Sequence, residues 1–437
     1  MMGIQPAPPH TGNGFSAAVG GRGYGVVAGT GTVSFQTVRE SNLRTVLRTV
    51  REHAPCSRAA VAAATGLNKT TVSSLVSDLM TRGLVRETGE TSQRRVGRPG
   101  VLLAPDERSV AAIGLEVNVD FLSVVAVDLL HRELVHRHVP LDARSAGARA
   151  CAHRIADTLR EVTEAPELRE RTVVGVSVAV PGLIDAPSGT VRRAPNLGWR
   201  EVPLRELLLS GLAGSALAGA TVLVDNDANL GAMAEYRFGP LAGLPDLVYV
   251  TGEVGIGAGV LVGGELLRGA GGFAGEIGHL ELDADGPECS CGRRGCLEAL
   301  AGIGAILRAA LPDLVPGRPL SGAEVAELVA VAVDRASAGE PTAVAALERA
   351  GTWLGRGVAT LVNVVNPGAV VLGGYFVPMA RWLVPRCREA ARAGSFAPEA
   401  GGCRVEPSDL GMSAASRGGA AVMIHGLESG TLPLPQP

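Results

Sequence analysis

The stretch GEIGHLELDADGPECSCGRRGCLEAL, residues 275–300, places three of the chain's seven cysteines within eight positions, as Cys289, Cys291 and Cys296. His279 lies ten residues before the first of them. One imidazole and three thiolates suit the tetrahedral preference of zinc, and four protein ligands make a closed, structural site. The segment therefore predicts a structural Zn²⁺ ion ligated by these four residues.

Buried free cysteines and disulfides are the alternatives for this cluster. Free cysteine is often buried as a small hydrophobe, but a polar, glycine-rich segment is a poor place to bury it. The other four cysteines are scattered along the chain: Cys56, Cys151, Cys387 and Cys403. Such scatter fits a reducing compartment better than a disulfide-stapled fold, so zinc is favoured. Glu276 and Glu298 bracket the cluster and are poor ligands beside three thiolates, which leaves them free to bind something else.

The composition indicates a large chain without membrane segments. Its 437 residues leave room for two or three domains, and 46% apolar residues with 3% aromatics predict cores of Ala, Val and Leu. No apolar run approaches the roughly 18 to 20 residues that span a bilayer. The N-terminus also lacks the basic region and apolar stretch of a signal peptide. We expect a cytoplasmic protein with no membrane partner.

The net charge of −3 is unevenly distributed. From Arg39 to Arg98 there are eleven Lys or Arg against five Asp or Glu, a balance of +6, so the remainder carries −9. A basic module joined to an acidic body suggests a polyanionic partner for the first part only. A solvated charged face would give the same count.

The N-terminal part has the pattern of a helix-turn-helix. Residues 1–37 are rich in Gly, Pro and Ala without apolar periodicity, so we expect a disordered tail. Apolar residues then recur at helical spacing, which predicts a helix capped by Ser41. A second helix is predicted at 57–65, and a third begins near Asn68 and ends at Gly83. Helices joined by a short, Gly-containing turn are typical of DNA-binding domains.

The third helix and the segment after it supply candidate DNA contacts. Short hydrogen-bonding side chains gather at the start of the helix, where a recognition helix meets base edges. They are Asn68, Lys69, Thr70, Thr71, Ser73 and Ser74. Predicted strands at 84–87 and 101–103 flank a wing with Arg94, Arg95 and Arg98, which suit phosphate or minor-groove contacts. We therefore predict a winged helix-turn-helix at 38–105 that binds double-stranded DNA, with an ordinary three-helix bundle as the alternative.

The remainder, residues 106–437, alternates strands and helices. Strands are predicted at 110–115, 121–127, 172–180, 220–224, 247–250, 260–262 and 369–372, and a helix at 149–162. Glycine-rich loops at 255–259 and 373–374 follow two of these strands. We expect an α/β body with ligands bound at strand ends.

Residues 110 to about 430 resemble the ROK family (repressor, ORF, kinase) of sugar kinases and repressors. The resemblance rests on Glu276-Ile-Gly-His279, the Cys-X-Cys-Gly-X-X-Gly-Cys-X-Glu run, the Asn226-Asp-Ala-Asn229 box and the Pro181-Gly182 turn. It implies an actin-like, two-lobed fold of the hexokinase type. With the winged helix in front, the chain resembles a ROK transcriptional regulator, which implies a homodimer or homotetramer.

The resemblance also implies a bound sugar. The residues that match the family's sugar ligands are Asn226, Asp227, Glu276, His279 and Glu298. Sugar hydroxyls need carboxylate acceptors and an amide that both donates and accepts. An imidazole can give one nitrogen to zinc and the other to a hydroxyl, so the metal would fix the pocket. Taken singly, each acid would be read as a surface residue, and Asn226 as the cap of a helix beginning near Ala228.

Three stretches depart from the nucleotide-binding pattern of the family's kinases. Where those kinases resemble Asp-X-Gly-Gly-Thr, this chain reads EVNVD at 116–120. Where they resemble Gly-Thr-Gly-Ile-Gly, it reads EVGIG at 253–257, and Tyr375 replaces a glycine that adjoins the adenine. Carboxylates oppose phosphates, which need bare glycines and a neutral or positive rim. Asp227, the general base by resemblance, is therefore predicted to be a ligand contact.

We expect a DNA-binding transcriptional regulator without enzymatic activity, a repressor of carbohydrate metabolism genes controlled by a sugar. Its expected partners are an operator, the sugar and further copies of the chain. The main alternative is a ROK sugar kinase with an added DNA-binding domain. A third interpretation is a scaffold that binds another protein.

Overall fold

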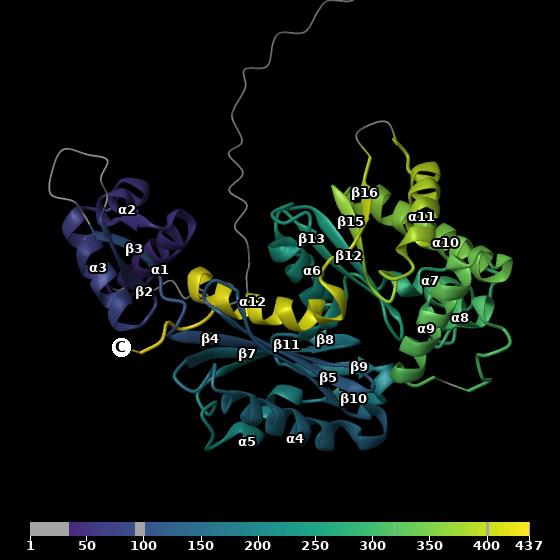
Figure 1. Cartoon of the computed structure of the whole chain (residues 1–437), viewed down its shortest axis with the longest axis horizontal. Helices are drawn as coiled ribbons and strands as arrows, with labels where there is room; N and C mark the ends of the chain where they lie inside the picture. The colour runs from purple at the N-terminus through teal and green to yellow at the C-terminus, as the bar shows by residue number, and fades with distance from the viewer. Residues whose placement is uncertain (1–34, 92–100, 319, 399–401, 437) are drawn as a thin grey trace, which may run out of the picture.

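The computed structural model describes residues 35–91, 101–318, 320–398 and 402–436 (Figure 1). Within these ranges the chain forms a small N-terminal domain followed by two α/β lobes. The predicted mixed α/β class and its winged helix-turn-helix are confirmed.

The N-terminal domain has three helices and a three-stranded sheet in the order β1-β3-β2. Its elements are α1 (Phe35–His53), β1 (Cys56–Ser57), α2 (Arg58–Thr65), α3 (Lys69–Thr81), β2 (Val85–Thr91) and β3 (Val101–Pro105). Ser57 caps α2 as predicted, because its hydroxyl accepts from the Ala60 amide at 3.2 Å. Gly66 ends α2 at a φ of 72°, the left-handed conformation that glycine adopts without strain.

The predicted start of the first helix is wrong. α1 begins at Phe35, and Ser41 lies exposed inside it, so the predicted boundary at residue 37 falls within the helix. Residues 35–40 contain neither Gly nor Pro, so nothing there prevents the helix from continuing upstream of a possible cap. The predicted wing contacts Arg94, Arg95 and Arg98 lie outside the described residues.

The first lobe is built on a five-stranded sheet in the order β11-β7-β4-β5-β6. Its strands are β4 (Val110–Val117), β5 (Phe121–Asp128), β6 (Glu133–Pro140), β7 (Thr172–Val180) and β11 (Thr221–Asn226). Helices α4 (Ala143–Thr163) and α5 (Leu204–Leu212) cover one face, while α12 (Ala414–Ser429) lies on the other (Figure 1). Because β7 and β11 are parallel, their carboxyl ends meet, and this brings Gly182 to the side chain of Asn226.

Two smaller parts of this lobe were not anticipated. A separate antiparallel sheet consists of β8 (Leu183–Asp185), β9 (Thr190–Ala194) and β10 (Trp199–Val202). The short helix η1 (Pro195–Leu197) connects β9 to β10. α4 starts six residues before the predicted position, with Asp142 as its cap. Gly147 interrupts α4 at a φ of 75°, which is why the helical pattern becomes continuous only after it.

The second lobe holds a sheet in the order β14-β13-β12-β15-β16. Its strands are β12 (Leu247–Gly252), β13 (Ile256–Val262), β14 (Glu265–Leu266), β15 (Ala369–Gly374) and β16 (Arg404–Pro407). One face packs against a helical layer that includes α7 (Leu297–Ala301), α8 (Ile303–Ala310), α9 (Gly322–Ser337), α10 (Pro341–Val365) and α11 (Ala380–Gly394). The other face packs against α6 (Asp227–Phe238).

The glycines predicted to form a ligand loop at 255–259 lie largely in a strand. β13 starts at Ile256, four residues earlier than expected. A Cβ added at Gly259 would lie 2.2 Å from the Ala228 carbonyl oxygen, so this glycine lets α6 approach the sheet. Close helix packing, rather than a phosphate, accounts for the residue type at this position.

Helices α6 and α12 lie between the two sheets, and α6 carries a buried acid. Burial raises the pKa of Glu235 to about 7, and the hydroxyl of Ser408 donates a hydrogen bond to its carboxylate. Because the folded pKa is raised, this group's contribution is complete below the unfolded value near 4.5 and is lost as pH rises through about 7.

Replacing Glu235 with Gln is therefore expected to flatten the dependence of stability on pH. Denaturant unfolding of the wild type should show a loss of about 2 to 3 kcal/mol between about pH 5 and about pH 8 that E235Q lacks. Contributions from other groups cancel in the difference between the two proteins. Parallel curves for wild type and variant would contradict the assignment.

The described helices include none that is long and apolar enough to cross a membrane.

Candidate functional site

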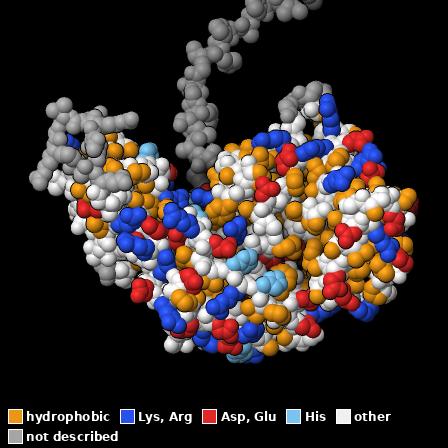
Figure 2. Space-filling view, viewed as in Figure 1, with side chains coloured by type: hydrophobic (Ala, Val, Ile, Leu, Met, Phe, Trp, Pro, Cys, Tyr) orange, Lys and Arg blue, Asp and Glu red, His pale blue; other side chains and the backbone are white. Residues whose placement is uncertain are grey.

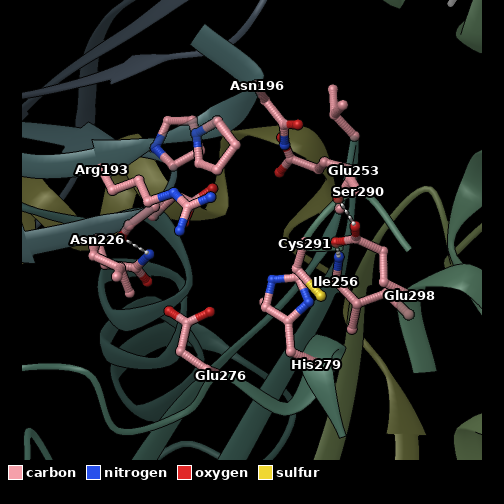
Figure 3. A pocket seen from close by; sticks show the side chains of 18 of the residues that line it. Arg193, Asn196, Asn226, Glu253, Ile256, Glu276, His279, Ser290, Cys291 and Glu298 are labelled. Atoms are coloured by element: carbon pink, nitrogen blue, oxygen red, sulfur yellow. Dashed lines mark hydrogen bonds between the residues drawn. The ribbon is translucent and has the colours of Figure 1, made fainter. Parts of the chain in front are cut away.

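A cavity of about 370 Å³ lies between the two lobes (Figure 3). It is within the size range of small-molecule sites. Its walls come from the β7–β8 turn, β9 and η1 on one side and from the start of α6, the β12–β13 turn and the cysteine-rich segment on the other. All five predicted sugar ligands line it: Asn226, Asp227, Glu276, His279 and Glu298.

Asn226 and Asp227 are positioned by the start of α6. The Asn226 Oδ1 atom accepts from the Asn229 amide at 3.1 Å, and its Nδ2 donates to the Gly182 carbonyl at 3.0 Å. The capping role considered for Asn226 is thus real, and it fixes the amide at the pocket wall. Asp227 Oδ1 accepts from the Ala228 amide at 2.8 Å, and burial raises the pKa of this carboxyl.

Glu298 is held by two hydrogen bonds at the start of α7. Its Oε2 accepts from the Ile256 amide at 3.1 Å, and its Oε1 accepts from the Ser290 hydroxyl at 3.1 Å. A Cβ added at Gly255 would lie 2.5 Å from Oε2, so a glycine is needed there for the carboxylate to approach. Each oxygen keeps a lone pair for a hydroxyl in the cavity.

His279 connects the pocket with the cysteine cluster. It ends the short helix η2 (Ile277–His279), which Glu276 precedes. The His279 Nδ1 atom lies 3.7 Å from Cys289 Sγ, which leaves the opposite ring nitrogen, Nε2, for a ligand in the cavity. Figure 3 shows the ring between the carboxylates of Glu276 and Glu298.

The four predicted metal ligands form one compact cluster. One ligand atom from each of His279, Cys289, Cys291 and Cys296 lies within 4.8 Å of all the others. Cys291 Sγ and Cys296 Sγ are 3.7 Å apart. Metal–sulfur bonds of about 2.3 Å in a tetrahedron require sulfur separations of about 3.8 Å. The cluster therefore has the ligand types and spacing to hold a metal ion.

The sequence pattern did not reveal several residues of the pocket wall. Arg193 from β9 and Asn196 from η1 reach the cavity from the first lobe. Ser290 and Arg293 come from the turns between the cysteines, and Arg293 donates to the His279 carbonyl at 3.0 Å. The two turn residues could have been suspected from their place in the metal motif. A lone arginine and asparagine on a hairpin carry no such signal.

Two acids, Glu116 and Glu253, occupy the region that corresponds to the phosphate loops of the family's kinases. Asn118 donates a hydrogen bond to Glu253 across the gap between the lobes. Glu116 is 1% exposed, and both its carboxylate oxygens lack a hydrogen-bond partner. Burial and, next, the Glu253 carboxylate raise the pKa of Glu116 well above its usual range. The phosphates of a nucleotide bound here would therefore face carboxyl groups, and the Asn118–Glu253 hydrogen bond between the lobes would lie in their way.

A second candidate interface is the outer face of α3. Asn68, Lys69, Thr70, Ser73 and Ser74 are exposed there and Thr71 is partly so, while the opposite face is buried. Asn68 caps the helix, since its Oδ1 accepts from the Thr71 amide at 2.8 Å. Ser73 Oγ donates to the Lys69 carbonyl at 2.9 Å. Five of the six predicted side chains therefore lie open to a partner, with Asn68 partly engaged as a cap.

Comparison with known proteins matches both parts of the chain. A model of the ROK family matches residues 112–426, and a model of the MarR family matches residues 45–95. The xylose repressor of Bacillus spizizenii is 30% identical over 389 residues, which cover 89% of this chain and 96% of the repressor.

Two solved structures resemble the chain in fold. A ROK family transcriptional regulator, a homologue of the Escherichia coli MLC protein, matches with a TM-score of 0.74 and 23% identity over 90% of this chain and 97% of its own. A ROK glucokinase from Streptomyces griseus, in complex with glucose and AMPPNP, matches with a TM-score of 0.59 and 28% identity over 71% of this chain and 98% of its own. Proteins named as a regulator and as a kinase thus share this fold, so the fold alone does not decide the activity.

Proposed function

The chain belongs to the ROK family, and we propose that it is a sugar-controlled, DNA-binding repressor whose effector binds in the cavity between the lobes. The observation that carries the proposal is the meeting of five sugar-type ligands in one cavity of a chain that also bears a winged helix. Three carboxylates, an imidazole and a fixed amide provide the acceptors and donors that a ring of hydroxyls requires.

The winged helix would bind operator DNA through α3. Its exposed polar residues would enter the major groove, and arginines of the segment between β2 and β3 would contact phosphates. The match to the MarR family supports this assignment. Paired half-sites favour a homodimer or a tetramer of the chain.

The effector would be a neutral, unphosphorylated sugar. Four acids line the cavity, Asp227, Glu253, Glu276 and Glu298, against the two arginines Arg193 and Arg293. Burial raises the pKa of Glu253 to about 8, so not all four acids are charged at neutral pH, but the lining still offers hydroxyl-binding groups rather than the cluster of cations that a phosphate ester requires. Xylose is the first candidate, because the 30% identical relative is a xylose repressor.

A structural zinc ion would shape the cavity from behind. His279, Cys289, Cys291 and Cys296 would hold it, and its charge would keep the three thiols deprotonated. His279 would ligate the ion through Nδ1, the nitrogen on the Cys289 side, and this would leave its other ring nitrogen available to a sugar hydroxyl. Zinc fits better than harder cations because the site has three thiolates.

Operator binding measured with and without sugar tests the proposal. We expect protein bound to DNA selected from a random library to be released by one neutral sugar, with a coupling of about 5- to 150-fold. Xylose, glucose and N-acetylglucosamine would each be titrated beside the corresponding phosphate ester. Operator affinity that no sugar changes would remove the proposal, and release by the ester alone would remove the neutral-sugar assignment.

A sugar kinase with an added DNA-binding domain is the second candidate, because Asp227 remains in the cavity as a possible general base. The Asn118–Glu253 bridge argues against a bound nucleotide. A measurement of ADP release in the presence of ATP and the bound sugar decides between the kinase and the repressor. Turnover would restore the kinase, and its absence in a protein that binds the sugar supports the repressor.

A further inference from the structure

One helix of the structure runs from the second lobe to the DNA-binding domain. α12 begins at Ala414, which shares a buried core with Val371 of β15, then lies on the first lobe's sheet and ends at α1 (Figure 1). Along the way it packs against α6, the helix whose first residue lines the cavity. The two helices therefore form a continuous physical connection between the cavity and the winged helix.

At their closest approach, α6 and α12 pack with backbone against backbone and no side chain between them. A Cβ added at Gly418 of α12 would lie 1.8 Å from the Leu230 carbonyl oxygen of α6. On the sheet side, a Cβ at Gly114 of β4 would lie 1.8 Å from the Ser416 carbonyl oxygen. Because backbone meets backbone on both sides, a displacement of α6 must be followed by α12 rather than absorbed by rotamer changes.

At its far end α12 presents a buried acid to the DNA-binding domain. Glu428 is 4% exposed, and its Oε1 lies 2.8 Å from Arg51 Nε of α1, an ion pair that is not aligned as a hydrogen bond. Arg51 Nη1 also lies 3.2 Å from His131 Nε2, which must accept because guanidinium only donates. The His131 ring stacks edge-on at 5.3 Å against Phe238, the last residue of α6. α12 thus contacts α1 directly, whereas α6 is connected to α1 through His131.

Apolar packing joins the same parts. Met423, Ile424 and Leu427 of α12 share a single buried core with α1 and α3. Leu432 and Leu434 belong to this core as well, and the carbonyls of Leu432 and Pro435 accept hydrogen bonds from arginines of the DNA-binding domain. The winged helix is therefore fastened to α12 and the segment after it, not tethered by a free linker.

We infer that α6 and α12 transmit sugar binding to the winged helix, and that the Glu428–Arg51 pair is the contact through which α12 sets the position of α1. This inference rests on the proposed function and adds its means of regulation. Sugar contacts at Asn226 and Asp227 bias α6, α12 follows, and α3 changes its place relative to a partner's half-site. The charged pair acts as a register contact, because a buried charge tolerates few alternative positions.

The test compares E428Q with the full-length wild type. E428Q keeps the shape of the side chain and removes its charge, and Glu428 lies outside the cavity lining. Calorimetric sugar affinity should remain that of the wild type, while the sugar-induced loss of operator affinity, about 5- to 150-fold in the wild type, should fall toward onefold. By linkage, operator DNA should also cease to weaken sugar binding.

E107Q is the matched control. Glu107 pairs with Arg86 at 3.1 Å across the same junction between the winged helix and the body, but it belongs to neither α6 nor α12. It should retain the wild-type coupling. Equal loss of coupling in both variants would show that any weakening of the junction uncouples sugar from operator binding, which would remove the specific role of the Glu428–Arg51 pair. Full coupling in E428Q would overturn the inference.

Hydrogen exchange of the wild type covers the case in which E428Q does not fold. Sugar should change amide protection in α6, the end of α12 and α1, relative to α4 and α5. A wild type that releases DNA with sugar but shows no change in α12 would overturn the inference alone. A wild type that never responds to sugar would instead overturn the proposed function.

Discussion

Removing the metal is expected to abolish sugar binding while the winged helix stays folded. The cavity side of the cluster consists of η2, with three residues, and α7, with five, both far too short to be stable alone. The backbone hydrogen bond that joins their ends runs from the Leu297 amide to the Leu280 carbonyl, at 2.8 Å. Structural zinc contributes about 10 to 16 kcal/mol in small zinc domains, so its loss should release Glu276, His279 and Glu298 together.

The DNA-binding domain should survive this treatment, because its core is formed with α12 and the first lobe and includes none of the four ligands. Chelation with metal analysis, sugar calorimetry and operator binding measures each part separately. Added zinc should restore the sugar titration. C289S should behave like the chelated protein, whereas C403S, which changes a cysteine outside the cluster, should bind metal and sugar normally. Native sugar affinity in metal-free protein would contradict the role assigned to the cluster.

Features that depend on local sequence were predictable. The metal cluster was found because its ligand types fall within one short segment, and the structure brings those four side chains together. Ser57 and Gly66 marked the ends of α2, since caps act on neighbouring amides and carbonyls. The resemblance then united Asn226 with Glu298, which are 72 positions apart and meet only in the folded cavity.

Features that depend on contacts between distant segments were not predictable. The sequence predicts a loop at Gly259 and assigns no role to Gly418, whereas in the structure both glycines are needed because the α6 backbone lies beside them. The hydrogen bond from Asn118 to Glu253 joins two lobes, and the sequence indicated only that each residue was unsuited to phosphate. Glu428 belongs to no sequence motif, and its burial and its ion pair with Arg51 of α1 follow only from the folded structure. No period or spacing encodes such meetings.

E298Q is expected to weaken sugar binding about 10- to 100-fold without unfolding the protein. The Glu298 carboxylate accepts from Ile256 and Ser290 and offers its remaining lone pairs to the cavity. An amide can satisfy the Ile256 amide with its one oxygen, but its NH₂ group then replaces the acceptor on the other side. Hydrogen bonds to a charged acceptor contribute about 1.5 to 3 kcal/mol each, and this loss sets the expected range.

E288Q provides the matched control for this change. Glu288 lies in the same cysteine-rich segment, its side chain is 83% exposed, and it pairs with Arg294 at the surface. The same loss of charge there should leave sugar affinity unaltered, because exposed ion pairs contribute little. Metal content and operator affinity without sugar should match the wild type in both variants. If E298Q bound sugar as tightly as E288Q, other residues of the cavity would hold the ligand. The hydrogen bonds of Glu298 with Ser290 and Ile256 would then serve only to hold the turn between β12 and β13 against the cysteine-rich segment.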